Sequence, residues 1–176
     1  MANLIEEKLK DIQSIVNEWL KFAEAKSTTL IAGNGVLIFG ASRSIISFEL
    51  EGFLFYYFIF LIILCCFSSI LCLLSLVPAL SMPWEDKPSN IDENDNLQYF
   101  AHIAKYTPST YLSKLISSLS ITSPVINNYQ KNQADQIITN SVIAVRKYNL
   151  FKKAIWLTLT AVTTPLFALV IYYIKE

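Results

Sequence analysis

The hydrophobic and polar positions along the chain separate one amphipathic stretch at the N-terminus from several long apolar stretches. Residues 3–27 carry apolar side chains at alternating steps of four and three, the heptad spacing of an amphipathic helix. These positions are Ile5, Leu9, Ile12, Val16, Trp19 and Ala23. We expect this stripe to pack on soluble helices of the same chain, with self-association and an interfacial position on a membrane as the alternatives.

Three apolar segments are long enough to cross a bilayer as helices, because about 20 apolar residues span its hydrocarbon core. The first, about 28–47, is interrupted by Asn34 and Arg43. The second, about 53–80, contains no charged residue. The third, 154–174, contains several threonines and is bracketed by lysines. The first two are joined by a short turn and form a predicted transmembrane hairpin, 28–80.

The first apolar segment continues directly from the N-terminal helix, and no proline separates the two, which allows one long helix. Its glycines would let another helix approach closely. The predicted contacts for helix packing or for an oligomer are Trp19, Gly33, Gly35 and Gly40.

The region 83–153 is more polar and predicts a linker followed by soluble helices. After an acidic, proline-containing linker, one short helix is expected at Asn96–Lys105 and another at Ser109–Leu119, with Ser109 as its N-cap. A third is expected to begin near Ser123, which precedes a proline, and to continue into the last apolar segment.

The distribution of lysine and arginine predicts how the spans are oriented. Basic residues precede the first and third segments, whereas the turn of the hairpin holds only acidic ones. By the positive-inside rule, residues 1–27 and 83–153 are cytoplasmic. The predicted fold is therefore an all-α membrane protein: a transmembrane hairpin and a third C-terminal span, 154–174, with a cytoplasmic helical region formed by the N-terminal helix and residues 96–153.

Composition agrees with a membrane protein and excludes several function classes. Hydrophobic residues make up 53% of the chain and charged residues 16%, against about 25% charged in soluble domains. The net charge is zero, which removes a bulk electrostatic case for binding a nucleic acid polymer. All three cysteines lie in one apolar run. We expect them to be small apolar side chains that face lipid or other helices rather than disulfides or zinc ligands.

The chain offers little catalytic chemistry. Its single histidine, His102, has no partner at metal-ligand spacing, and its four glycines form no phosphate-binding loop. The acidic group Asp92, Glu93 and Asp95 is expected to be a solvated connector rather than a metal site. We therefore predict a protein that is not an enzyme and has neither a cofactor nor a metal.

Two motifs resemble the Pycsar transmembrane effector family. The first is VNEWLKFAEAKSTTL, from Val16 to Leu30, which leads into a span containing glycines. The second is QIITNSVIAVRKY, from Gln136 to Tyr148, which precedes the last span. The order of hairpin, soluble helices and final span is also similar, so the resemblance covers most of the chain.

The resemblance implies a bacterial antiphage effector in the inner membrane. A partner cyclase would make a cyclic nucleotide on infection, and the effector would sense it and impair the membrane as a homo-oligomer, causing growth arrest or death of the infected cell. The residues that would then contact the nucleotide are Glu24, Lys26, Arg146 and Lys147, because a cyclic phosphate needs one or two cations. The alternative is that these charges only anchor the chain at the membrane surface.

Two other functions stay open from the sequence. The chain could be a membrane scaffold or regulatory protein whose cytoplasmic helices bind a partner protein. A transporter or channel subunit is less favoured, because secondary transporters usually have repeated halves and the chain has no internal repeat.

Overall fold

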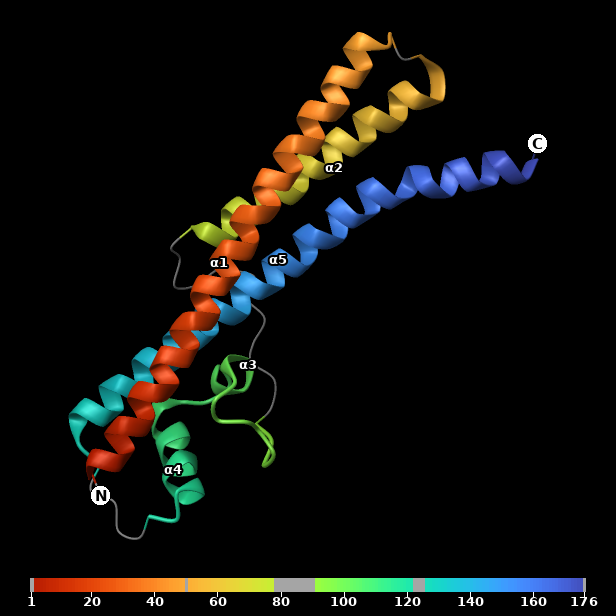
Figure 1. Ribbon diagram of the computed structural model, residues 1–176. Helices are drawn as coiled ribbons and strands as arrows, with labels where there is room; N and C mark the ends of the chain where they lie inside the picture. Colours follow the sequence, from red (N-terminus) through yellow and green to blue (C-terminus); the bar gives the residue numbers. More distant parts are fainter. Residues whose placement is uncertain (1, 50, 78–90, 122–125, 176) are drawn as a thin grey trace. The chain divides into compact units, whose positions relative to one another are not determined.

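The computed structural model describes residues 2–49, 51–77, 91–121 and 126–175, and these ranges contain helices and no strand. The elements are α1 (Ala2–Ser47), α2 (Gly52–Leu76), α3 (Phe100–Ile103), α4 (Pro108–Ser118) and α5 (Asn128–Lys175) (Figure 1). They divide into two compact units. Unit 1 comprises Met1–Ala23 and Pro78–Tyr148, and unit 2 comprises Glu24–Val77 and Asn149–Glu176. The predicted all-helical fold is confirmed.

Two helices contribute residues to both units. The predicted N-terminal helix and first span form one helix, α1, of 46 residues, in agreement with the lack of a proline between them. In the same way α5 runs for 48 residues from the soluble region into the last apolar segment. The predicted beginning of this helix near Ser123 lies outside the described residues, and α5 is described from Asn128.

Unit 1 is organised around the apolar stripe of α1. Ile5, Leu9, Ile12 and Val16 are each at most 2% exposed. They share one hydrophobic core with residues of α3, α4 and α5, among which the most deeply buried are Ile103, Tyr111, Leu112, Ala134, Ile137 and Ala144. The stripe therefore packs on other helices of its own chain, as the sequence predicted.

The N-cap of helix α4 lies two residues before the predicted one. Thr107, and not Ser109, is the N-cap, and its hydroxyl accepts a hydrogen bond from the Thr110 amide. The Thr110 hydroxyl in turn accepts from the Thr107 amide at 3.0 Å, which completes a capping box. The prediction of Ser109 as cap was wrong because Pro108 fits the first turn of a helix, where its missing N–H needs no partner.

The predicted helix at Asn96–Lys105 is much shorter in the structure, where only α3, Phe100–Ile103, is helical. The side chain of Asn96 accepts a hydrogen bond from the Gln98 amide at 2.9 Å, and the Asn96 amide donates to Nδ1 of His102 at 2.9 Å. These local bonds compete with the helical pattern and hold residues 96–99 in a turn.

Unit 2 contains the helical hairpin of α1 and α2. Among the described residues, these are the two helices long and apolar enough to cross a membrane. They are joined through Gly52, whose φ of +62° suits glycine. The end of the predicted second span, beyond Val77, lies outside the described residues. The third predicted span, 154–174, is not one of these two candidates and stays a prediction.

Candidate functional site

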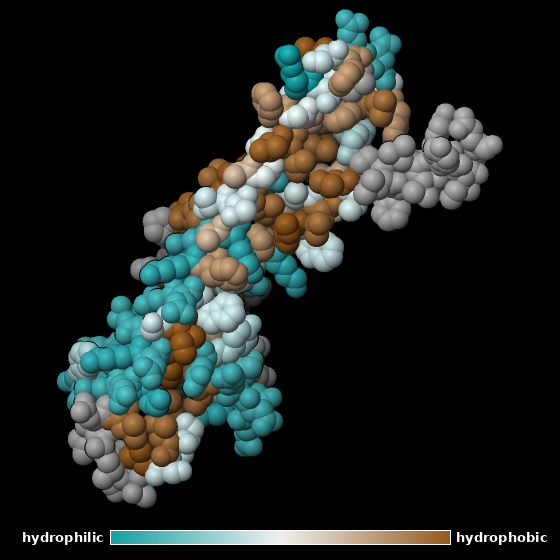
Figure 2. Space-filling view, in the orientation of Figure 1, coloured by the Kyte–Doolittle hydropathy of each residue, from teal (hydrophilic) through white to brown (hydrophobic). Residues whose placement is uncertain are grey.

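Unit 2 has small and polar side chains inside and large apolar side chains outside, the reverse of a soluble protein. Leu61 is the one large aliphatic residue buried in its described part. The other buried residues are Ser27, Asn34, Ala41, Cys65, Ser68, Cys72, Ser75, Ala154, Thr158 and Ala161. By contrast, Phe39, Tyr56 and Trp156 are 62–72% exposed, and apolar side chains gather over the hairpin in Figure 2. This arrangement is typical of helices whose outer surface contacts lipid.

Asn34 is the centre of the polar interior of unit 2. Its Nδ2 donates to the Ser68 hydroxyl at 2.9 Å, and its Oδ1 accepts from the Thr158 hydroxyl at 2.8 Å. The Ser68 hydroxyl donates to the Ala154 carbonyl at 2.9 Å. Since these bonds join α1, α2 and α5, the buried amide is paired on both sides and ties the three helices together.

Two more polar contacts lie within the same helix group. The hydroxyls of Ser27 and Ser75 are 3.4 Å apart, and the Tyr57 hydroxyl donates to the Ala161 carbonyl at 3.1 Å. We name the five buried polar residues of unit 2 the polar seam: Ser27, Asn34, Ser68, Ser75 and Thr158. The seam is absent from the predictions made from the sequence. Its signal was the seven-residue spacing of residues 27, 34 and 41, and of 61, 68 and 75, which marks one face of each helix.

The three predicted packing glycines lie on the outside of α1. A Cβ atom added at Gly33, Gly35 or Gly40 would meet nothing within 4 Å. They therefore do not serve a close helix approach among the described residues of this chain, and a role in contacts between chains stays a prediction.

The four charged residues predicted to contact a nucleotide belong to different units. Arg146 and Lys147 lie on α5 in unit 1, whereas Glu24 and Lys26 lie on α1 in unit 2. Lys147 is buried, and Lys26 Nζ lies 5.9 Å from the centre of the Phe151 ring. Each of the four has an interaction within the protein. Their meeting in one cluster stays a prediction.

Trp19 is surrounded by aromatic rings of unit 1. Its ring centre lies 5.5 Å from that of Phe100 and 6.2 Å from that of Tyr148, while Phe100 and Tyr148 stack at 5.1 Å. Tyr99 meets the edge of the same cluster at 6.5 Å. This cluster joins α1, α3 and α5 within the unit, which gives Trp19 a packing role inside the chain.

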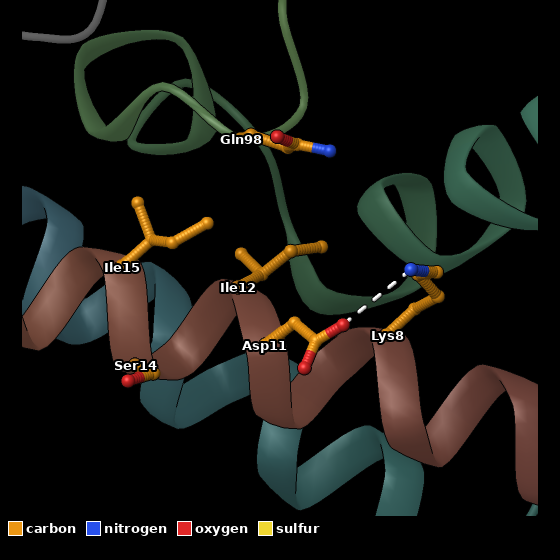
Figure 3. Close-up of a pocket in the computed structure, with 6 residues that line it drawn as sticks. All are labelled: Lys8, Asp11, Ile12, Ser14, Ile15 and Gln98. Carbon is orange, nitrogen blue, oxygen red and sulfur yellow. Dashed lines mark hydrogen bonds and ion pairs between the residues drawn. The ribbon is translucent and has the colours of Figure 1, made fainter.

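A groove of about 450 Å³ lies against the outer face of α1 in unit 1. It is lined by Lys8, Asp11, Ile12, Ser14, Ile15 and Gln98, and Figure 3 shows the Lys8 and Asp11 side chains joined at one end and Gln98 opposite the two isoleucines. Lys8 Nζ donates to Asp11 Oδ2 at 3.4 Å. A cation, a carboxylate, an amide and apolar surface are the group types that hold a small polar ligand, and the groove is an open hollow rather than an enclosed pocket.

The acidic linker contains one buried carboxylate rather than three solvated ones. Asp95 is buried and accepts a hydrogen bond from Lys105 Nζ at 2.7 Å and one from the Tyr106 hydroxyl at 3.2 Å. The Lys105 hydrogen bond, followed by the Asp92 amide, lowers the pKa of Asp95 to about 2. The prediction of a solvated connector was therefore wrong for Asp95, which clamps the segment before α3. In the described part of the chain no group of His, Cys, Asp and Glu could hold a metal ion.

Comparison with known proteins adds one match that covers nearly the whole chain. The sequence model of a family described as the Pycsar effector protein domain matches residues 8–174. No curated protein and no solved structure matches the chain.

Proposed function

Because the chain belongs to the Pycsar effector family, and so is an antiphage defence effector, we propose that it senses a cyclic nucleotide and impairs the inner membrane of the infected cell. A partner cyclase would supply the nucleotide. The chain would act as a non-enzymatic homo-oligomer, with residues 1–27 and 83–153 in the cytoplasm.

The observation that carries this proposal is the inverted interior of unit 2. Large apolar side chains cover its outside, whereas a buried amide and four hydroxyls lie between its helices. Such an arrangement costs free energy in water and is stable in lipid. The hydrogen bonds of Thr158 and Ser68 also tie residues 154–161 of α5 to the hairpin. This supports the proposal that 154–174 is a third span.

The sensing region is proposed to involve unit 1, and two places in the chain suit a cyclic phosphate, which needs one or two cations. One is the predicted set Glu24, Lys26, Arg146 and Lys147. The other is the α1 groove, where the Lys8 side chain is 44% exposed and Gln98 and the half-buried Ile15 can contact a base. The groove is supported by its volume and accessibility, and the predicted set by its three cations near the residues expected at the membrane surface.

The signal would pass from unit 1 to unit 2 along the helices that contribute to both, α1 and α5. A ligand shifts a conformational equilibrium only by its difference in affinity for the two states. Two buried polar atoms of unit 1, Gln133 Oε1 and Ser141 Oγ, have no hydrogen-bond partner in the described part of the chain. Unpaired buried groups on α5 favour a second arrangement in which they are paired.

Oligomer formation is proposed because three helices are too few to surround an open aqueous path, so neighbouring chains would have to complete its wall. The exposed glycines of α1 offer a surface where helices of neighbouring chains can approach closely. The apolar stripe of α1 is already buried in unit 1, which leaves the glycine face as the better supported contact.

Membrane potential in living bacteria tests the proposal. The chain is expressed with each of several nucleotide cyclases, and a potential-sensitive dye is read at equal levels of inserted protein. One cyclase is expected to cause depolarisation and growth arrest, and its catalytically dead variant is the control.

Depolarisation by none of the cyclases, with the protein shown to be inserted, would overturn the sensing proposal. It would favour the alternative function, a membrane scaffold whose cytoplasmic helices bind a partner protein.

A further inference from the structure

We infer that the polar seam of unit 2 lines the path by which water and small ions cross the membrane when the effector is active. This inference rests on the proposed function and names the part of the chain that carries out the membrane damage. In the described structure the seam is closed, because all five of its side chains are at most 8% exposed.

The position of the seam along the helices fits a path through the bilayer. The buried face that holds the seam runs from Ser27 to Ala41 on α1 and from Leu61 to Ser75 on α2, 14 residues on each helix, and the seam residues themselves occupy the half between Ser27 and Asn34 and between Ser68 and Ser75. At 1.5 Å per residue the whole face is about 21 Å long, or roughly two thirds of the hydrocarbon core. The Tyr57 hydroxyl, bonded to the Ala161 carbonyl, adds a polar group beyond Leu61.

The chemistry of the seam suits a switch between dry and wet states. Its members are uncharged, and their partners are other hydroxyls, one amide and a backbone carbonyl. Water replaces such hydrogen bonds at little cost in enthalpy. The fully buried neighbours of the seam are Cys65, Cys72 and Ala154, so separation of the helices there exposes small side chains, whereas Leu61 lies towards the other end of the buried face.

The outer surface of unit 2 is less suited to line the path than the seam. Its exposed side chains include Phe39, Phe60 and Trp156, which are suited to lipid. The exposed hydroxyls of Thr160, Thr163 and Thr164 bond to carbonyls of their own helix, whereas the seam side chains bond from one helix to another. Since the seam bears no charge, we expect it to pass cations and anions with similar ease.

The native cysteines provide the test without new residues. Cys65 and Cys72 are fully buried on the seam face of α2, whereas Cys66 is exposed on the outer face. Three variants each keep one of them: C66S/C72S, C65S/C66S and C65S/C72S. Bacteria expressing each variant with the depolarising cyclase are treated with a charged, membrane-impermeant methanethiosulfonate, and modification is followed by mass spectrometry.

The expected result is that Cys65 and Cys72 are modified about tenfold faster or more once the cyclase acts, because a thiol must be hydrated to form the reactive thiolate. Cys66 should stay slow, since it faces lipid. Depolarisation with no increase in the modification rate of Cys65 and Cys72, or with an equal increase in that of Cys66, would overturn the inference that the seam lines the path. The proposed function would stay intact. Absence of depolarisation with every cyclase would overturn both.

A second measurement does not depend on thiols. Asn34→Asp places a negative charge in the seam and should raise the permeability of K⁺ relative to Cl⁻ in reconstituted vesicles, compared with the unchanged chain. An unchanged ratio in a variant that still depolarises the membrane would contradict the inference.

Discussion

Oδ1 of Asn34 on α1 accepts a hydrogen bond of 2.8 Å from the hydroxyl of Thr158, which lies 124 residues later on α5. Both side chains are buried, and the Thr158 hydroxyl is also 2.9 Å from the hydroxyl of Ser68 on α2. Asn34 interrupts the first apolar segment in the sequence, but in the structure it is the residue that joins all three helices of unit 2. A polar residue in a membrane segment that faces other helices is compatible with lipid around them.

This pairing predicts that Asn34 and Thr158 stabilise unit 2 jointly. Thr158→Val should lower the free energy of unfolding by about 1 kcal/mol, in line with hydrogen bonds between membrane helices. Asn34→Ala should lower it by about 1–3 kcal/mol, because Ser68 and Thr158 lose a partner in a buried place. The double variant should lose less free energy of unfolding than the sum of the losses of the two single variants. Reversible unfolding in mixed micelles measures all three.

Thr160→Val is the matched control for Thr158. Its hydroxyl is exposed and donates only to the Trp156 carbonyl of its own helix, at 2.9 Å. It should leave stability within a few tenths of a kcal/mol. Equal losses at positions 158 and 160, or strict additivity of Asn34→Ala with Thr158→Val, would contradict the account of the polar seam.

The two candidate N-caps of α4 give a second prediction. Thr107→Ala removes the acceptor for the Thr110 amide and should destabilise unit 1 by about 1 kcal/mol. Ser109→Ala should cost clearly less, since its hydroxyl contacts only the Thr107 side chain, at 3.2 Å. Denaturant unfolding followed by circular dichroism compares them, and a larger loss at Ser109 would refute the assignment of the cap.

The periodicity of apolar residues was enough to predict the core of unit 1. Ile5, Leu9, Ile12 and Val16 pack as their heptad spacing indicates. In an aqueous environment the apolar face of an amphipathic helix has to be covered by other helices. The length of α1 also followed from the sequence, since no proline separates the amphipathic stretch 3–27 from the first apolar segment 28–47. These features depend on local pattern alone.

Features that depend on tertiary contacts could not be predicted in this way. Asp95 occurs among acidic neighbours in a polar linker, and only the fold brings Lys105 and Tyr106 onto it. Asn34 looked like an interruption because its partners, Ser68 and Thr158, lie on other helices. The location of the nucleotide site depends on contacts of this kind and is still a proposal.

The buried Asp95 predicts how the stability of unit 1 depends on pH. Its pKa of about 2 in the folded protein lies below the ordinary value of 3.8, so its stabilising contribution is complete above about pH 4 and is lost as the pH falls towards 2. Asp95→Asn should be less stable than the unchanged chain at pH 6, and the difference should shrink between pH 4 and pH 2. Denaturant midpoints across this range measure the effect.

Asp135→Asn, at an exposed position on α5, controls for the loss of any carboxylate. It should show neither the loss of stability at pH 6 nor the change of slope between pH 4 and pH 2. A constant difference between Asp95→Asn and the unchanged chain over the whole range would show that the Lys105 contact is not responsible.

The two candidate nucleotide sites can be separated by binding to purified protein in detergent. If the α1 groove holds the phosphate, Lys8→Ala should weaken binding of the activating nucleotide about tenfold, which corresponds to about 1.4 kcal/mol. In that case Lys147→Ala should bind normally. If the predicted charged set holds the phosphate, Lys147→Ala should weaken binding about tenfold and Lys8→Ala should bind normally. Lys10→Ala, on the same helix but outside the groove lining, is the control for loss of a positive charge.

The most direct measurement of the central claim uses only the purified chain, lipid and nucleotide. The protein is reconstituted in vesicles of phosphatidylethanolamine and phosphatidylglycerol that hold a K⁺ diffusion potential. Cyclic AMP, cyclic GMP, cyclic CMP and cyclic UMP are then added one at a time. We predict that one of them collapses the potential at a protein density that is silent without it. A potential that persists with all of them, in vesicles where folded and inserted protein has been verified, would contradict a nucleotide-triggered loss of the membrane barrier.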